Sequence, residues 1–211
     1  MKINEQNFIK RNMKKNETDE WLTPESAVIP LVEQLRTKGF KTVWCPFDLD
    51  DSNYVKVLKE NKFTVINSHL ENGQDFFTYE PSIHYDVVVS NPPYTLRNEV
   101  LKRIFELNKP FALLLNYSGL FDNQKRFNMF KENGIELFIL KGRTGFIRRS
   151  NGFCAKPLFQ SIYLCHNIFD ERIVYQSWLI QNVLYFYDYV LTITSLYVTI
   201  YVVEERLFFL S

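Results

Sequence analysis

Residues 90–94 read Ser-Asn-Pro-Pro-Tyr, a combination that can act on an aromatic amine. Such an amine is a poor nucleophile because its lone pair is delocalised into the ring. Two acceptors that hold both of its N–H groups can draw the nitrogen toward tetrahedral geometry, and the Asn91 side-chain oxygen and the Pro92 carbonyl form a candidate pair. The two prolines fix the loop, so the acceptors are preorganised. Tyr94 offers a flat face on which an extruded base can stack.

The residues before this motif bear on whether it is a functional loop or an ordinary turn. Asn-Pro-Pro is also common turn chemistry at the end of a strand. Here it follows Tyr85–Val89, a β-branched run typical of a buried parallel strand. Parallel-sheet folds bind ligands outside the carboxyl ends of their strands. We therefore predict that the catalytic residues are Asn91, Pro92, Pro93 and Tyr94.

The Asn-Pro-Pro-Tyr motif resembles the signature of S-adenosylmethionine-dependent amino methyltransferases. These include DNA N6-adenine, rRNA guanine-N2 and release-factor glutamine-N5 enzymes. Three further segments are similar to those of small phage-type adenine methyltransferases: Asp19–Pro24, Val43–Asp48 with the downstream Asp75-Phe76-Phe77, and Leu140–Phe146. The resemblance covers roughly residues 19–166. It implies a Rossmann-like class I fold, S-adenosylmethionine as cofactor, and methyl transfer to the N6 amine of adenine in DNA.

The resemblance also implies roles for individual residues. The residues assigned to the cofactor are Trp21, Thr23, Pro24, Pro46, Phe47, Asp48, Asp75 and Phe76. Among them, Asp75 is implied to accept a hydrogen bond from the cofactor adenine. Phe146 is implied to stack on the face of the extruded base opposite Tyr94.

Basic side chains gather around Phe146 in the sequence. They are Lys141, Arg143, Arg148, Arg149 and Lys156. A solvated loop is one interpretation of this cluster. The other, which we prefer, is a set of phosphate contacts to DNA, which give affinity while base contacts give specificity.

Two departures from the resembled pattern keep other functions open. The loop Trp44–Asn53 contains no glycine, although close approach of backbone to a cofactor usually uses one. After the second expected strand, Asn67, Ser68 and His69 stand where an acid commonly meets the ribose hydroxyls. The alternatives are a methyltransferase acting on RNA or protein glutamine, and a degenerate methyltransferase fold that binds nucleic acid without catalysis.

The elements expected to position these residues alternate between helices and strands. Strands are expected at Thr42–Cys45, Phe63–Asn67, Tyr85–Ser90, Phe111–Leu115, Ile135–Leu140 and Gln160–Cys165. Helices are expected around Ala27–Leu35, Val55–Glu60, Leu96–Leu107 and Phe127–Asn133. Pro30 should kink the first helix or start it. This order predicts an α/β fold with a mostly parallel central sheet and helices on both faces.

The 211 residues divide by composition into three parts. Residues 1–20 form a polar leader, expected to be flexible. Residues 21–166 form the methyltransferase domain. Residues 167–211 form a C-terminal extension of uncertain structure, with closing strands of the sheet as one interpretation. Within it, residues 189–203 carry no charge but are shorter than the ~20 residues of a transmembrane helix, so we expect no membrane anchor.

Composition excludes several classes of protein. Hydrophobic residues make up 46% and charged residues 23%, as in an ordinary folded domain, and the net charge is +1. The three cysteines and three histidines lack metal-ligand spacing, so we expect no metal site and no disulfide framework. The N-terminus has no apolar signal segment, which favours a cytoplasmic protein. No feature of the sequence specifies an oligomeric state.

Overall fold

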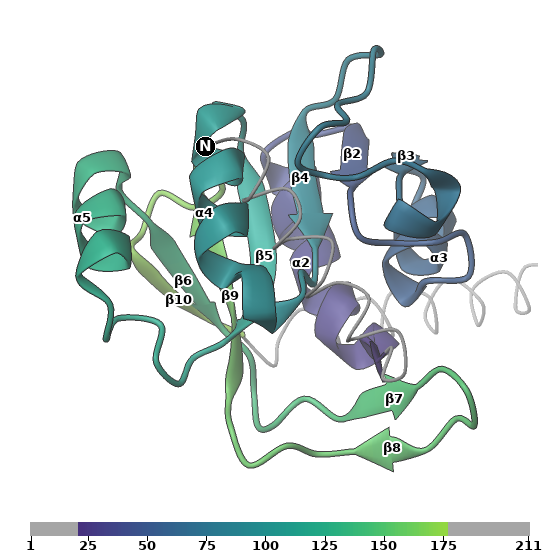
Figure 1. Cartoon of the computed structure of the whole chain (residues 1–211). Coiled ribbons are helices and arrows are strands. Elements are labelled where there is room, and N and C mark those ends of the chain that lie inside the picture. Colours follow the sequence, from purple (N-terminus) through teal and green to yellow (C-terminus); the bar gives the residue numbers. More distant parts are fainter. Residues whose placement is uncertain (1–20, 177–211) are drawn as a thin grey trace, which may run out of the picture. The chain divides into compact units, whose positions relative to one another are not determined.

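The computed structural model describes residues 21–176, which form an α/β unit around a seven-stranded sheet (Figure 1). The strand order is β10-β6-β9-β5-β4-β2-β3, and every neighbouring pair is parallel except the two that involve β9. The predicted mostly parallel α/β fold is therefore confirmed. The strands are β2 Thr42–Cys45, β3 Thr64–Asn67, β4 Val87–Ser90, β5 Phe111–Asn116, β6 Glu136–Ile139, β9 Ser161–His166 and β10 Ile173–Tyr175.

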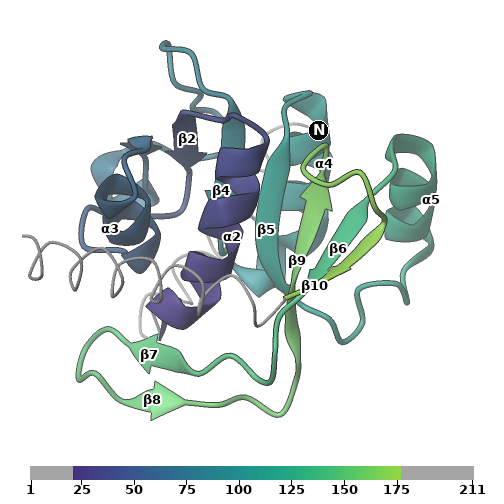
Figure 2. The ribbon, with the colours of Figure 1, turned by 180° about the vertical axis from the view of Figure 1, so that it is seen from behind.

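Helices cover both faces of this sheet (Figures 1 and 2). Helices α2 (Glu25–Thr37) and α3 (Asn53–Glu60) pack on one face, against side chains such as Val43 and Cys45 of β2. Helices α4 (Arg97–Glu106) and α5 (Gln124–Asn133) pack on the other, where Trp44 of the same strand is buried. Because successive side chains of a strand point to opposite faces, β2 contributes to both cores.

Short polar side chains cap the N-termini of two helices. Ser52 caps α3 by accepting a hydrogen bond from the Tyr54 backbone N–H, and Asn123 caps α5 in the same way. The expectation that the first helix could start at Pro30 is wrong, because α2 already begins at Glu25. Pro30 lies inside the helix, where it removes only one backbone donor while the buried side of α2 keeps the helix in place.

A second, three-stranded sheet has the order β1-β7-β8 and is entirely antiparallel. It joins β1 (Trp21–Leu22) to a hairpin of β7 (Phe146–Arg148) and β8 (Cys154–Ala155). In Figure 1 this hairpin lies across the end of the main sheet at which the β4 arrow points. The segment that carries the predicted basic cluster is therefore folded as a hairpin beside the strand ends.

Several boundaries differ from the expected ones. The segment expected to be one helix from Leu96 begins as a 3₁₀ turn, η2 (Tyr94–Leu96), before α4. A second short 3₁₀ turn, η1 (Leu70–Asn72), follows β3. Strand β10 falls in the predicted C-terminal extension and pairs in parallel with β6. The leader 1–20 and the uncharged run 189–203 lie outside the described residues, and the predicted domain boundaries stay predictions.

Within residues 21–176, no helix is long and apolar enough to cross a membrane. In that same range, no three His, Cys, Asp or Glu side chains are grouped so that they could hold a metal ion. All three cysteines are unpaired thiols, of which Cys45 and Cys165 are buried.

Candidate active site

A cavity of about 680 Å³ lies at the carboxyl ends of β2 and β4. These strands are parallel neighbours in the middle of the sheet, and the chain runs from β2 out to β3 before it returns to β4 on the other side. The strand order therefore reverses at this point, which is where open α/β sheets bind their ligands. The cavity has the size of a small-molecule or cofactor site.

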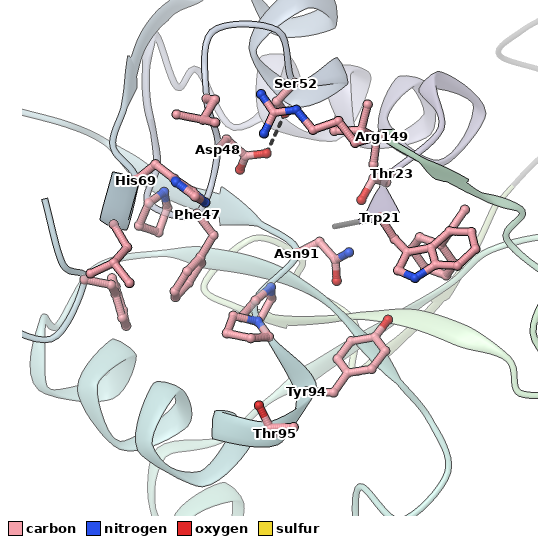
Figure 3. A pocket seen from close by; sticks show the side chains of 18 of the residues that line it. Trp21, Thr23, Phe47, Asp48, Ser52, His69, Asn91, Tyr94, Thr95 and Arg149 are labelled. Carbon is pink, nitrogen blue, oxygen red and sulfur yellow. Dashed lines mark hydrogen bonds between the residues drawn. The ribbon is translucent and has the colours of Figure 1, made fainter. Parts of the chain in front are cut away.

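Asn91 carries a buried polar atom without a partner inside this cavity. Its Oδ1 is inaccessible to solvent and accepts no hydrogen bond from the described protein. Figure 3 shows the Asn91 amide in the middle of the cavity, between Asp48 and Tyr94. A buried acceptor left unpaired is costly, so the side chain is positioned for a donor that a ligand supplies.

The rest of the motif forms a rigid turn beneath Asn91. Pro93 accepts a hydrogen bond from the Leu96 backbone N–H and caps the 3₁₀ turn η2. This turn directs Tyr94 into the cavity, where the Arg97 guanidinium lies 5.9 Å from its ring centroid. Burial raises the pKa of Tyr94 to about 12, so its hydroxyl stays neutral at physiological pH.

Asp48 lies in the first loop, residues 46–52 between β2 and α3, and connects this loop to the motif. It is only 8% exposed, and its two carboxylate oxygens accept hydrogen bonds of 2.5 Å from the hydroxyls of Ser52 and Ser90. Ser90 is the residue directly before Asn91, so the carboxylate links the ends of β2 and β4. Burial raises the pKa of Asp48 to about 6, although both hydrogen bonds act in the opposite direction.

Aromatic side chains form the wall beyond the first loop. The rings of Phe47 and Phe76 are 4.8 Å apart, and Phe76 packs on the buried Trp44. His69 and Glu71, from the turn after β3, also line the cavity. Glu71 thus provides an acid near the end of β3, four residues beyond Asn67.

The hairpin closes the opposite side of the cavity. Arg149, just after β7, forms an ion pair with Asp51 of the first loop through contacts of 2.7 and 2.9 Å. Arg148 lies over the Trp21 ring at 5.0 Å from its centroid. These contacts tie the segment expected to be a basic loop to elements about one hundred residues earlier in the chain.

Most of the predicted site residues come together around this cavity. Those that line it are Trp21, Thr23, Pro46, Phe47, Asp48, Phe76, Asn91, Pro92, Pro93, Tyr94, Phe146 and Arg149. Those that do not are Pro24, Asp75, Lys141, Arg143 and Arg148.

The predicted residues outside the cavity wall have other contacts. Pro24 precedes α2 as its N-cap, and the Asp75 carboxylate accepts a hydrogen bond from the Phe77 backbone N–H. Lys141 and Arg143 are exposed. Phe146 lines the cavity but also belongs to the core cluster that includes the buried side chains of α2, and it is 6% exposed.

The sequence reasoning missed several residues of the wall. Phe159 lies in edge-to-face contact with Tyr94 at 5.9 Å, and the predicted stacking role of Phe146 stays a prediction. Asp51 and Glu71 were also missed. The signal for Glu71 was its position shortly after β3, whereas nothing in the sequence indicates that Phe159 meets Tyr94.

Comparison with known proteins identifies the family. A family model described as Eco57I restriction-modification methylase matches residues 7–168. The chain belongs to this methylase family. The predicted resemblance to methyltransferases is confirmed, and membership implies a methyl group taken from S-adenosylmethionine.

A curated protein and a solved structure are also similar to parts of this methylase. The methylase is 38% identical to the Type II methyltransferase M.EcoRI of Escherichia coli over 64 residues, which are 29% of the chain and 19% of that relative. The chain thus spans a small part of the length of this curated protein. A release-factor-specific protein-(glutamine-N5) methyltransferase of Alicyclobacillus acidocaldarius is 13% identical, with 68% of this chain and 93% of that chain covered and a TM-score of 0.34.

The cavity of the methylase fits S-adenosylmethionine by its chemistry. The cofactor carries a positive sulfonium, an adenine ring and ribose hydroxyls. The cavity offers a matching group for each: the buried Asp48 carboxylate for the sulfonium, the Phe47 and Phe76 rings for the adenine, and the Glu71 carboxylate for the ribose hydroxyls. The unpaired Asn91 oxygen lies beside Asp48 and is free for the second reactant.

Proposed function

We propose that this methylase transfers a methyl group from S-adenosylmethionine to the N6 amine of adenine in DNA. The observation that carries the proposal is the buried, unpaired Asn91 Oδ1 at the carboxyl end of β4, inside the cavity that also holds Asp48. An exocyclic amine supplies an N–H donor of the kind that such an acceptor binds. The proposal is supported by the restriction-modification methylase family to which the chain belongs.

The chain's own residues prepare the amine for attack. Asn91 Oδ1 and the Pro92 carbonyl each accept one N–H of the amine, which localises its lone pair on nitrogen. Because Pro92 and Pro93 restrict the loop, these acceptors need little reorganisation during the reaction. When bound, the cofactor supplies an electrophilic methyl group. The amine loses its proton after the transfer, so no general base is required beforehand.

The target base is held by aromatic side chains. An adenine must leave the duplex to reach Asn91, and stacking offsets part of the cost of unpairing it. Tyr94 supplies one stacking surface for the base. Phe159 contacts the Tyr94 ring and extends this aromatic surface. Phe146 contributes to the cavity wall from the hairpin.

The cofactor half of the cavity offers substitutes for both missing features of the resembled pattern. Glu71 would accept hydrogen bonds from the ribose hydroxyls in place of an acid directly after β3. Phe47 and Phe76 would pack against the cofactor and Asp48 would face its sulfonium, since all three line the cavity. Such side-chain contacts would let the first loop hold the cofactor without a glycine.

Cations around the cavity provide the electrostatic part of DNA binding. Lys141, Arg143 and Lys156 are exposed on the segment between β6 and β9. We assign them to phosphate contacts, which would make binding salt-dependent. Arg148 and Arg149 support the hairpin through Trp21 and Asp51.

A substrate panel tests the proposal. The full chain is incubated with methyl-labelled S-adenosylmethionine and, in separate reactions, with unmethylated mixed-sequence DNA, RNA of matched sequence, and a glutamine-containing protein extract. We expect label in DNA alone. Label only in RNA or only in protein would contradict the choice of substrate. DNA binding without saturable cofactor binding would instead indicate a degenerate, non-catalytic fold.

A further inference from the structure

The segment between β8 and β9, which can be followed in Figure 1, carries a highly exposed leucine. Its side chain is the most exposed large apolar one among residues 21–176. Leu158 is 96% exposed. A single exposed leucine is common on protein surfaces, so exposure alone assigns no role. The position of Leu158 relative to the cavity is what makes it informative.

Both sequence neighbours of Leu158 belong to the cavity wall. Pro157 and Phe159 line the cavity, and Phe159 contacts the Tyr94 ring. Leu158 itself does not line the cavity. Its side chain is therefore held at the rim, outside the cavity and one residue away from the aromatic side chain that meets Tyr94.

Hydrogen bonds hold this rim in place. The Gln160 side chain donates to the backbone carbonyls of Leu140 at 3.1 Å and Gly142 at 2.6 Å. Arg143 approaches the Pro157 carbonyl at 3.5 Å. The ring of Pro157 further restricts the backbone. Leu158 is thus an apolar side chain presented to solvent from a supported segment rather than from a free loop.

An extruded base leaves a gap in the duplex next to the cavity. DNA-binding proteins often insert apolar side chains between base steps where the stack is opened. We propose that Leu158 enters the duplex and fills the space that the target adenine vacates. This inference rests on the proposed function. The exposed cations Lys156, two residues from Leu158, and Arg143, which approaches the Pro157 carbonyl, are suited to hold the backbone on either side of the opening.

The test compares double-stranded with single-stranded substrate. Leu158→Ala and Leu158→Phe are assayed with methyl-labelled S-adenosylmethionine on mixed-sequence duplex DNA and on the same DNA after strand separation. Ile83→Ala is the matched control, because Ile83 is also an exposed apolar residue (60%) but precedes β4 and so lies toward the amino ends of the strands.

We expect Leu158→Ala to lower the rate on duplex DNA roughly tenfold and to change the rate on single strands by less than about twofold, since a separated strand has no gap to fill. Leu158→Phe should retain most of the duplex rate, and Ile83→Ala should resemble the wild type. An equal loss on both substrates, or no loss on duplex DNA, would overturn the role of Leu158 while leaving the proposed function intact. If the wild type labels no DNA of either form, the proposed function fails and the inference fails with it.

Discussion

Replacing Asp48 by Asn should stabilise the folded protein at neutral pH while weakening cofactor binding. Asp48 is 8% exposed, and its carboxylate accepts hydrogen bonds from the neutral hydroxyls of Ser52 and Ser90, so its negative charge is poorly solvated. Asn has nearly the same shape and no charge. The variant therefore removes the cost of the buried carboxylate without creating a cavity.

The size and the sign of this effect follow from the pKa of Asp48. The carboxyl has its ordinary pKa of 3.8 in the unfolded chain and a pKa of about 6 in the folded protein. Between these values the folded state binds the proton more tightly, so the stability of the wild type falls as pH rises through this window. The difference between the two pKa values corresponds to about 3 kcal/mol in the free energy of unfolding, at about 1.4 kcal/mol per pKa unit.

Urea unfolding of the wild type and of Asp48→Asn at several pH values measures the effect. The two proteins should have similar free energies of unfolding near pH 4, where Asp48 is protonated in the folded state. At pH 8 the variant should be more stable by up to about 3 kcal/mol. Asp50→Asn is the control, because Asp50 lies in the same loop but its side chain is 85% exposed.

Cofactor titrations on the same proteins complete the experiment. Asp48→Asn should bind S-adenosylmethionine at least about tenfold more weakly at pH 8, because the variant lacks the charge that we propose to face the cofactor sulfonium. Wild-type affinity should itself fall as pH drops below about 6. A variant that is destabilised at pH 8, or that binds the cofactor as tightly as the wild type, would refute this assignment of Asp48.

Substitutions at three further positions test the rest of the site and the core. Tyr94→Ala should lower methyl transfer by roughly 10- to 100-fold, with cofactor binding unchanged in titrations, whereas Tyr94→Phe keeps the stacking face and most of the rate. Asp51→Asn breaks the ion pair with Arg149, so the KM for cofactor should rise several-fold. The free energy of unfolding in urea should change by less than about 1 kcal/mol, as for an exposed ion pair. An unchanged KM would show that the site does not need this link between the hairpin and the first loop. Tyr163→Phe removes a buried hydroxyl that bonds to Tyr54 and to a backbone carbonyl of α2, and thermal unfolding should show a loss of about 1–3 kcal/mol.

The main sheet was predictable because its strands are short, apolar and bounded by polar turns. Thr42–Cys45 was found with its observed limits, and the Val87–Val89 run is fully buried as a parallel strand should be. The antiparallel direction of β9 was not predictable, because an apolar run indicates a strand but not its direction. Strands β7 and β8 were missed because only short apolar stretches interrupt the charged residues of this segment.

Some features of the candidate site were likewise predictable from the sequence, and others were not. The positions of Asn91 and Tyr94 were predictable because both residues follow a recognisable strand closely, so their place at its carboxyl end follows from the chain itself. The contact between Asp51 and Arg149, and that between Tyr94 and Phe159, join residues far apart in the sequence. Such contacts depend on how the hairpin packs, which no local pattern encodes.

The most direct test of the central claim concerns Asn91. Wild type and Asn91→Ala are incubated side by side with methyl-labelled S-adenosylmethionine and unmethylated DNA, the DNA is digested, and the labelled nucleoside is identified. We predict that the wild type places the label in N6-methyladenine. The variant should lose at least about 100-fold in rate while its cofactor affinity, its unfolding curve and its DNA binding stay unchanged. Label in any other nucleoside, or a variant that retains the wild-type rate, would contradict the account.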